Sequence, residues 1–126
     1  MQSMTTDVRI HTQSEYLQEQ SEPNHRRFAF AYTIKISNNG DLDIILVSRH
    51  WIIIDGLQVR KEVRGDGVVG KQPTINSGSC FEYTSAVFIG TPVGTMQGSY
   101  KFKNGNGKTF SAEIEPFLLA TPASVH

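Results

Sequence analysis

Strict alternation of side chains between residues 27 and 37 constrains the fold of this chain more than any other feature. Phe28, Phe30, Tyr32, Ile34 and Ile36 fall on one face of an extended segment, and smaller or polar residues fall on the other. A period of two residues is typical of a β-strand with one buried face. No window of the sequence shows convincing helical periodicity, so the chain is predicted to be all-β.

Further segments of β-type composition predict the remaining strands, at residues 8–12, 42–54, 58–63, 80–88, 96–103, 109–115 and 117–120. Turn residues separate them, and Asn39-Gly40 after the first-named strand is the strongest short hairpin signal. Seven or so short strands with regular turn signals indicate a sandwich or a barrel. A chain of 126 residues is long enough for one such core, so residues 1–126 are expected to form a single domain.

Residues 42–54 are apolar on both faces. Simple alternation puts one set on one face (Leu42, Ile44, Leu46, Ile52, Ile54) and a second set on the other (Ile45, Val47, Trp51, Ile53). Thirteen extended residues would span about 43 Å, at roughly 3.3 Å each, so a bend or bulge is expected near residues 48–50. The second apolar row needs a cover, and Pro116 is expected to mark a bulge or strand end.

Composition excludes several classes of partner. Lys and Arg number 12, as do Asp and Glu, so nothing favours general binding to nucleic acid or to an anionic membrane. The single cysteine, Cys80, cannot form an intrachain disulfide, and the opening residues MQSMTTDV have no signal-peptide character. No apolar run approaches the roughly 20 residues needed to cross a membrane. A reducing cytoplasm is the expected compartment.

Gly65, Gly67 and Gly70 form a G-x-G-x-x-G motif in the middle of the chain. A dinucleotide-binding fold requires a helix directly after such a motif, and the following sequence KQPTINSG cannot open one. Two readings remain. The glycines permit positive φ angles in a loop, or the loop from Arg64 to Lys71 binds an anion through its backbone N–H groups. Residues 60–71 carry a local excess of two positive charges, which would suit an anion, but positive φ angles in a loop are the simpler explanation of the glycines.

Arg49 and Trp51 are a second candidate site, for a protein partner. Alternation puts both on one face of the 42–54 strand, with His50 on the other. Trp51 is expected in the core or at the base of a surface patch, and the alternative is a binding hot spot, where Trp and Arg are enriched.

Catalytic and metal-binding constellations are weak in this sequence. The four histidines are scattered along the chain: His11, His25, His50 and His126. Cys80 has no second thiol beside it, so structural zinc, other metals and cofactors are not expected. Glu113 and Glu115 resemble a paired-carboxylate site, but solvated strand residues explain them more simply. Direct metal sensing would require separate carboxylates to converge (Asp41, Asp43, Asp55). No G-x-S-x-G elbow is present, and no catalytic residue is assigned.

The chain resembles the bacterial ApaG family, also called CorD. The resemblance rests on an ordered series of segments along nearly the whole length: RHWIIIDG, VRGDGVVGKQP, FEYTS, TPVGTMQGSY and IEPFLLA. It implies an immunoglobulin-like, fibronectin type III-like β-sandwich, a genetic link to cobalt tolerance and magnesium efflux, and use as an interaction module. The family's G-x-G-x-x-G motif has been suspected of binding pyrophosphate or nucleotide, so the resemblance extends that expectation to Gly65, Gly67 and Gly70. Lys71 stands where the family usually has Glu.

Two functional hypotheses follow. The first is a non-enzymatic binding module connected with divalent-cation homeostasis, with a protein partner or a second copy of the chain on the outward row of residues 42–54. Cover of that row by residues 117–120 would count against it. The second is an anion site at residues 64–71 for pyrophosphate or a nucleotide.

Overall fold

A computed structural model describes residues 7–124 of the chain. Eight strands account for most of them: β1 (Val8–Tyr16), β2 (Phe28–Asn38), β3 (Ile44–Asp55), β4 (Arg60–Asp66), β5 (Thr74–Ile75), β6 (Cys80–Ile89), β7 (Val93–Asn104) and β8 (Thr109–Ala120). Three short 3-10 helices complete the described elements: η2 (Gln18–Gln20), η3 (Pro23–His25) and η4 (Pro122–Ser124). The predicted all-β class and strand number are confirmed.

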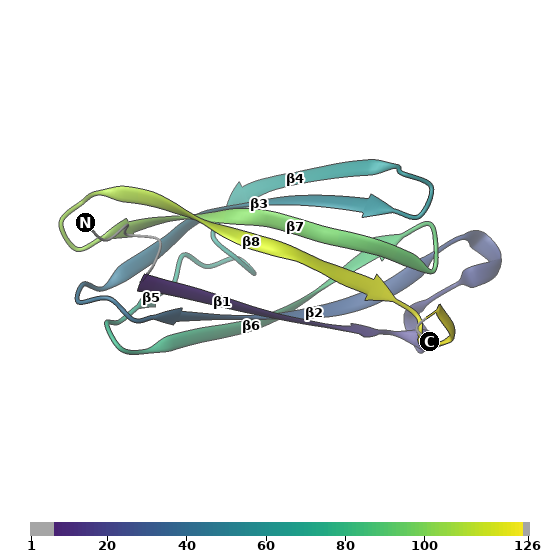
Figure 1. Cartoon of the computed structure of the whole chain (residues 1–126), viewed down its shortest axis with the longest axis horizontal. Helices are drawn as coiled ribbons and strands as arrows, with labels where there is room; N and C mark the ends of the chain where they lie inside the picture. The colour runs from purple at the N-terminus through teal and green to yellow at the C-terminus, as the bar shows by residue number, and fades with distance from the viewer. Residues whose placement is uncertain (1–6, 125–126) are drawn as a thin grey trace.

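The strands form two antiparallel sheets that pack face to face (Figure 1). One sheet has the order β1-β2-β6, and the other has the order β4-β3-β7-β8 with β5 paired to one end of β3. This division of a single chain between two antiparallel sheets is the sandwich architecture that the strand pattern predicts.

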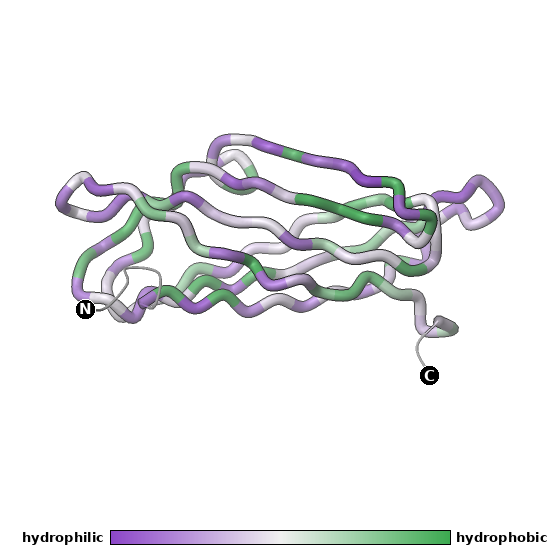
Figure 2. The backbone as a smooth tube through the Cα atoms, turned by 45° about the horizontal axis from the view of Figure 1, so that its top comes forward, coloured by the Kyte–Doolittle hydropathy of each residue, from purple (hydrophilic) through white to green (hydrophobic). Residues whose placement is uncertain are grey.

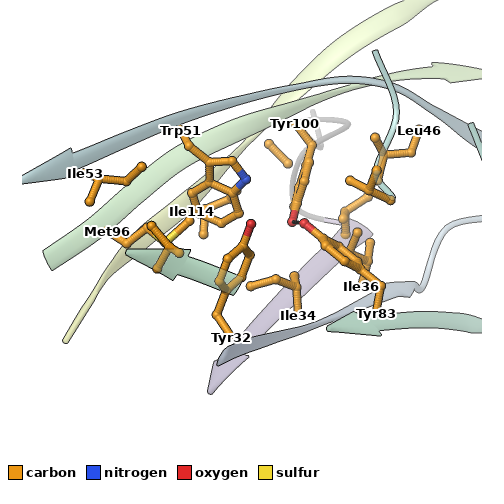
Figure 3. Packing of buried hydrophobic residues seen from close by; sticks show 14 of the residues in the cluster. Tyr32, Ile34, Ile36, Leu46, Trp51, Ile53, Tyr83, Met96, Tyr100 and Ile114 are labelled. Atoms are coloured by element: carbon orange, nitrogen blue, oxygen red, sulfur yellow. Dashed lines mark hydrogen bonds between the residues drawn. The ribbon is translucent and has the colours of Figure 1, made fainter. Parts of the chain in front are cut away.

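The predicted inward face of β2 is confirmed. Phe30, Ile34 and Ile36 are fully buried and Tyr32 nearly so, while Phe28 packs at the margin of the core. They meet the inward residues of β3, β7 and β8 in one hydrophobic cluster (Figure 3). The period-2 pattern of β2 therefore supplies one wall of the core.

The turn after β2 does not close a hairpin. β2 and β3 belong to different sheets, so residues 39–43 carry the chain across the sandwich. The buried Asn38 fixes this crossing, because its Nδ2 donates to the carbonyl oxygens of Leu42 (2.8 Å) and Ile75 (2.9 Å). The Asn39-Gly40 signal predicted the position of the turn correctly. It was wrong about the pairing, because β2 and β3 lie in different sheets that face each other across one core.

The predicted irregularity in the 42–54 strand is a β-bulge, located between Leu46 and Ser48. It corrects the face assignment made by simple alternation. The extra residue shifts the alternation by one, so Ile44 and Leu46 share the buried face with Trp51 and Ile53. The apolar residues on the outward face include the exposed Ile45 and the half-buried Ile52 and Ile54.

The last strand extends further than predicted. β8 runs to Ala120, with a register shift opposite Met96 and Gly98 that leaves Glu115 and Pro116 facing the single residue Gln97. Pro116 therefore lies in a bulge, as predicted. Residues 117–120 continue the ladder beside β7, so β7 separates them from β3 in the sheet and they do not cover the outward row of β3.

Candidate functional site: the open side of the sandwich

The two lateral sides of the sandwich differ. On one side β1 lies against β8, and the Ser14 hydroxyl donates to the Leu118 carbonyl oxygen at 2.7 Å. On the other side the edge strands are β4 and β6, which pair only with β3 and β2 respectively among the described strands. Figure 2 shows β4 as a largely hydrophilic stretch along the margin of the molecule. We call this β4–β6 margin the open side, and the sequence-predicted sites lie along it.

The side chain of Arg49, on β3, packs against the glycine-rich segment. Its Nη1 donates to the carbonyl oxygens of Asp66 (3.0 Å) and Gly67 (2.9 Å). Gly65 pairs with Arg49 across the ladder, and a Cβ at Gly65 would lie 2.7 Å from the guanidinium Nη1. Gly65 is therefore the residue that leaves room for the Arg49 side chain to cross the strand.

The two later glycines shape a tight hairpin at residues 68–71. Val68 and Lys71 exchange backbone hydrogen bonds of 2.8 and 2.9 Å, and the two residues between them, Val69 and Gly70, have φ angles of 43° and 78°. Positive φ at both central positions is typical of a type I′ turn. Gly67 has a φ of 58°, and its N–H donates to the carbonyl oxygen of the bulge residue Val47 at 2.8 Å.

Only some backbone N–H groups of this segment donate a hydrogen bond within the described residues. Those of Gly67, Val68 and Lys71 donate to carbonyl oxygens, whereas those of Val69 and Gly70 have no acceptor within residues 7–124. The side chains of Arg64 and Lys71 are exposed to solvent. The 68–71 hairpin thus presents two N–H groups with cations nearby, while the carbonyl oxygens of Asp66 and Gly67, just before it, hold the guanidinium of Arg49.

Trp51 is buried, with 2% of its surface exposed. Three aromatic rings hold it in edge-on contacts, with ring centroids 5.4 Å from Tyr32, 6.1 Å from Tyr100 and 6.0 Å from Phe117. Its indole Nε1 is the buried side-chain polar atom without a hydrogen-bond partner in the described residues. A partner could contact Trp51 only by way of an opening into the core.

Such an opening exists on the open side, as a pocket of about 290 Å³ beneath the 68–71 hairpin. Arg49, Trp51 and Gly70 all line it, so the structure brings together parts of both sequence-predicted sites. Arg64, Gly65, Gly67 and Lys71 do not line it. Sequence reasoning missed Tyr32 and Tyr83, which also line the pocket, and only the inward alternation of Tyr32 gave a signal for either.

A second pocket of about 290 Å³ lies further along the open side, near the start of β4. Its cationic residues are Arg26, Arg27 and Lys61, and Asp55 is its acidic residue. The Arg27 guanidinium lies 4.0 Å from the centroid of the Phe88 ring, and Lys61 Nζ donates to the Phe88 carbonyl oxygen at 3.2 Å. The exposed Val59 lines the same pocket, so this end combines positive charge with apolar surface.

The outer face of the five-stranded sheet carries a charged cluster. Nε2 of His50 hydrogen-bonds to Oε2 of Glu62 at 2.7 Å, and Arg64 Nη2 lies 3.2 Å from the same oxygen. The hydrogen bond from His50 is the main cause that lowers the pKa of the Glu62 carboxyl, and the nearby Arg64 and Arg60 contribute charge in the same direction. Glu113 and Glu115 on β8 are exposed strand residues, as the simpler explanation predicts.

Within residues 7–124 no three His, Cys, Asp or Glu side chains lie close enough together to hold a metal ion. Asp41, Asp43 and Asp55 therefore do not converge on one metal site. His126, named among the scattered histidines, lies outside the described residues, as do residues 1–6 and 125 of the expected 1–126 domain. None of the described helices has the length and apolar character to span a membrane.

The fold defines a class: an all-β, two-sheet sandwich domain in which β4 and β6 are the edge strands of its open side. A model of the ApaG domain matches residues 18–104. Protein ApaG of Pseudomonas putida is 53% identical over 120 residues, which cover 95% of this chain and 94% of that protein. The chain belongs to the ApaG domain family, and the resemblance seen in the sequence is confirmed.

Solved structures agree with this assignment. The putative ApaA protein from Bordetella pertussis is 46% identical, with a TM-score of 0.89 over 92% of this chain and 94% of its own. An X-ray structure of a Northeast Structural Genomics Consortium target is 40% identical, with a TM-score of 0.93 over 98% of this chain and 94% of its own. Both superpose over almost the whole sandwich, so the fold is shared across the length described above.

Proposed function

We propose that this protein is a non-enzymatic binding module, and that its open side holds an extended segment of a partner protein. The observation that carries the proposal is the pair of edge strands, β4 and β6, each with one unpaired margin in the described structure. An extended chain can add to such a margin through main-chain hydrogen bonds, with side-chain pockets giving specificity. The two pockets of about 290 Å³ lie along this side.

The chemistry of the open side indicates what the partner segment contains. Val59 and Val69 are 61% and 53% exposed; Val59 directly precedes β4, Val69 lies in the 68–71 hairpin after it, and each lines one of the two pockets. Arg26, Arg27 and Lys61 surround the pocket near Val59. Apolar side chains flanked by cations favour a segment that carries both apolar and acidic residues. A second copy of this chain is the self-association form of the same proposal.

The family resemblance suggests the setting in which this module works, namely divalent-cation homeostasis expressed as cobalt tolerance and magnesium efflux. A deletion strain complemented with variants tests both parts. Arg27→Glu reverses a charge on the open side and is expected to lose complementation of growth in cobalt. Arg9→Glu, an exposed change on β1, serves as the matched control and should complement fully. Equal growth of the two strains would contradict the proposal.

The second candidate function is binding of pyrophosphate or a nucleotide at residues 64–71. It is supported by the N–H groups of Val69 and Gly70, which have no acceptor in the described residues, and by the exposed side chains of Arg64 and Lys71. Lys71→Glu and Arg64→Ala are each expected to weaken pyrophosphate binding in an amide NMR titration. Shifts that are absent, or that lie outside residues 64–71, would remove this candidate. Phosphorus NMR with magnesium present tests for turnover of a bound nucleotide.

A further inference from the structure

The pocket beneath the 68–71 hairpin joins solvent to the core of the sandwich. Its apolar wall includes Val63, Val87 and Met96, and its polar groups belong to Tyr32, Arg49, Trp51 and Tyr83, among others. These polar groups come from β2, β3 and β6, so both sheets contribute to it. Converging polar groups beside an apolar wall are typical of a small-molecule site.

The indole N–H of Trp51 is the first indication that this pocket binds a ligand with a hydrogen-bond acceptor. Trp51 Nε1 can only donate, it is buried, and it has no acceptor in the described residues. Figure 3 shows the nitrogen on the side of the indole that faces the hydroxyls of Tyr32, Tyr83 and Tyr100. Leaving a buried N–H without an acceptor costs free energy comparable to a lost hydrogen bond, so such groups are uncommon in folded proteins.

The neighbouring groups add further donors. The hydroxyls of Tyr83 and Tyr100 lie 2.5 Å apart, and whichever of them accepts this hydrogen bond keeps a proton that has no acceptor in the described residues. Burial raises the pKa of both tyrosines well above the ordinary value, so both keep their protons at neutral pH. Arg49 uses Nη1 for two carbonyl oxygens, and its other N–H groups have no acceptor within residues 7–124. Trp51 and Arg49 therefore both bring N–H groups without an acceptor in the described residues to this pocket.

We propose that the pocket binds a small organic acid, whose carboxylate accepts hydrogen bonds from Trp51 Nε1 and from the Arg49 guanidinium. A carboxylate offers about four acceptor positions and no donor, which matches the unpartnered N–H groups of Trp51 and Arg49, and guanidinium–carboxylate hydrogen bonds are among the stronger ones. The apolar body of the acid packs against Val63, Val87 and Met96. This apolar wall favours a carboxylic acid over inorganic phosphate.

The size of the pocket limits the acid. Ligand sites commonly measure roughly 300–1,000 Å³, so about 290 Å³ is at the small end and suits a compact acid of the size of benzoate. This site requires no protein partner and no phosphate at residues 64–71, so it goes beyond the proposed function and can fail separately from it.

The chain's single tryptophan makes the test direct, because ¹H–¹⁵N spectra contain one indole N–H cross-peak. We expect benzoate to shift this cross-peak in a saturable manner, while benzyl alcohol, which has the same ring without the charge, and inorganic phosphate leave it in place. Arg49→Gln should weaken benzoate binding by about tenfold or more, as expected for loss of a charged hydrogen-bond donor. Arg64→Gln is the matched control, since it removes the same charge outside the pocket.

A second measurement covers the case in which Arg49→Gln fails to fold. In the unmodified protein, nuclear Overhauser effects should join the benzoate ring protons to the methyl groups of Val63, Val87 and Met96. An indole cross-peak that does not move with benzoate up to its solubility limit would overturn the proposal. Equal shifts with benzyl alcohol, unchanged affinity in a folded Arg49→Gln variant, or benzoate contacts elsewhere on the protein would overturn it as well.

Discussion

The three glycines of the G-x-G-x-x-G motif have separate structural tasks. Gly65 gives space to the Arg49 guanidinium, while Gly67 and Gly70 take φ angles of 58° and 78°. Gly67 is the most constrained of them, because a Cβ there would collide with the backbone carbonyl of Lys71. A spacing that elsewhere serves phosphate binding thus has a sufficient geometric cause here, in the packing of one arginine and one tight turn.

Alanine substitutions at Gly67 and Gly70 should therefore lower the free energy of unfolding by different amounts. Gly67→Ala combines a positive φ with a backbone collision, so it is expected to lower the free energy of unfolding by about 2 kcal/mol or more. Gly70→Ala has the positive φ with open space and should cost about 1 kcal/mol. Gly105→Ala, where neither condition holds, is the control. Urea denaturation measures all three, and an equal cost at positions 67 and 105 would contradict this assignment.

The Glu62 carboxyl is expected to titrate below its ordinary pKa, because the ionised form accepts a hydrogen bond from His50 and lies beside Arg64 and Arg60. A lowered folded-state pKa means that this contribution to stability is present above the unfolded pKa and is lost as pH falls through the folded one. Carbon-detected NMR of the carboxyl should show its midpoint move upward in a His50→Ala variant. A midpoint that stays unchanged would show that the hydrogen bond is not its main cause.

At the scale of single elements, the β3 bulge decides which residues reach the core. It brings Leu46 and Ile53, seven positions apart, to the same buried face. It also frees the Val47 carbonyl oxygen to accept from Gly67 N and, at 2.9 Å, from Gln72 Nε2. One extra residue in β3 therefore both sets the register of the core and anchors the glycine-rich segment against the sheet.

This register can be tested with alanine substitutions along β3. Leu46→Ala and Ile53→Ala should each lower the free energy of unfolding by about 2–4 kcal/mol, since both remove fully or nearly fully buried side chains. Ile45→Ala should cost well under about 1 kcal/mol because Ile45 is 39% exposed. Chemical denaturation distinguishes this pattern from uninterrupted alternation, in which Leu46 and Ile53 would lie on opposite faces and only one of them would be costly.

The strands were largely predictable from the sequence and the site was not, for a physical reason. Alternation in β2 and β8 is local and reports directly which face is buried, and Pro116 marks its own bulge because it lacks an N–H. The β3 bulge has no side-chain signature of that kind, so the faces after residue 46 were assigned wrongly. The pocket depends on contacts between distant segments: Arg49, Gly70 and Tyr83 meet only because β4 and β6 become edges of different sheets.

At the scale of the whole molecule, the asymmetry between the two sides of the sandwich is the central feature. On one side β1 and β8 lie in direct contact, whereas on the other the Lys61 side chain bridges β4 to the Phe88 carbonyl oxygen of β6 and two pockets lie along the margin. Two pockets, two exposed valines and a group of cations lie on the same open side. Edge strands usually carry devices that block pairing, and here the charges of β4 serve that purpose while leaving a surface that a complementary segment can use.

The most direct measurement of this account is site-specific photo-crosslinking in living cells. A photoreactive phenylalanine analogue would replace Val59 on the open side, Ile45 on the outer face of the five-stranded sheet, or Arg9 on β1, all of them exposed positions. The account predicts one discrete crosslinked protein, or a crosslinked dimer of this chain, from position 59 and none from positions 9 and 45. A discrete product from position 45 alone, or equal products from all three, would contradict the claim that the open side is the binding surface.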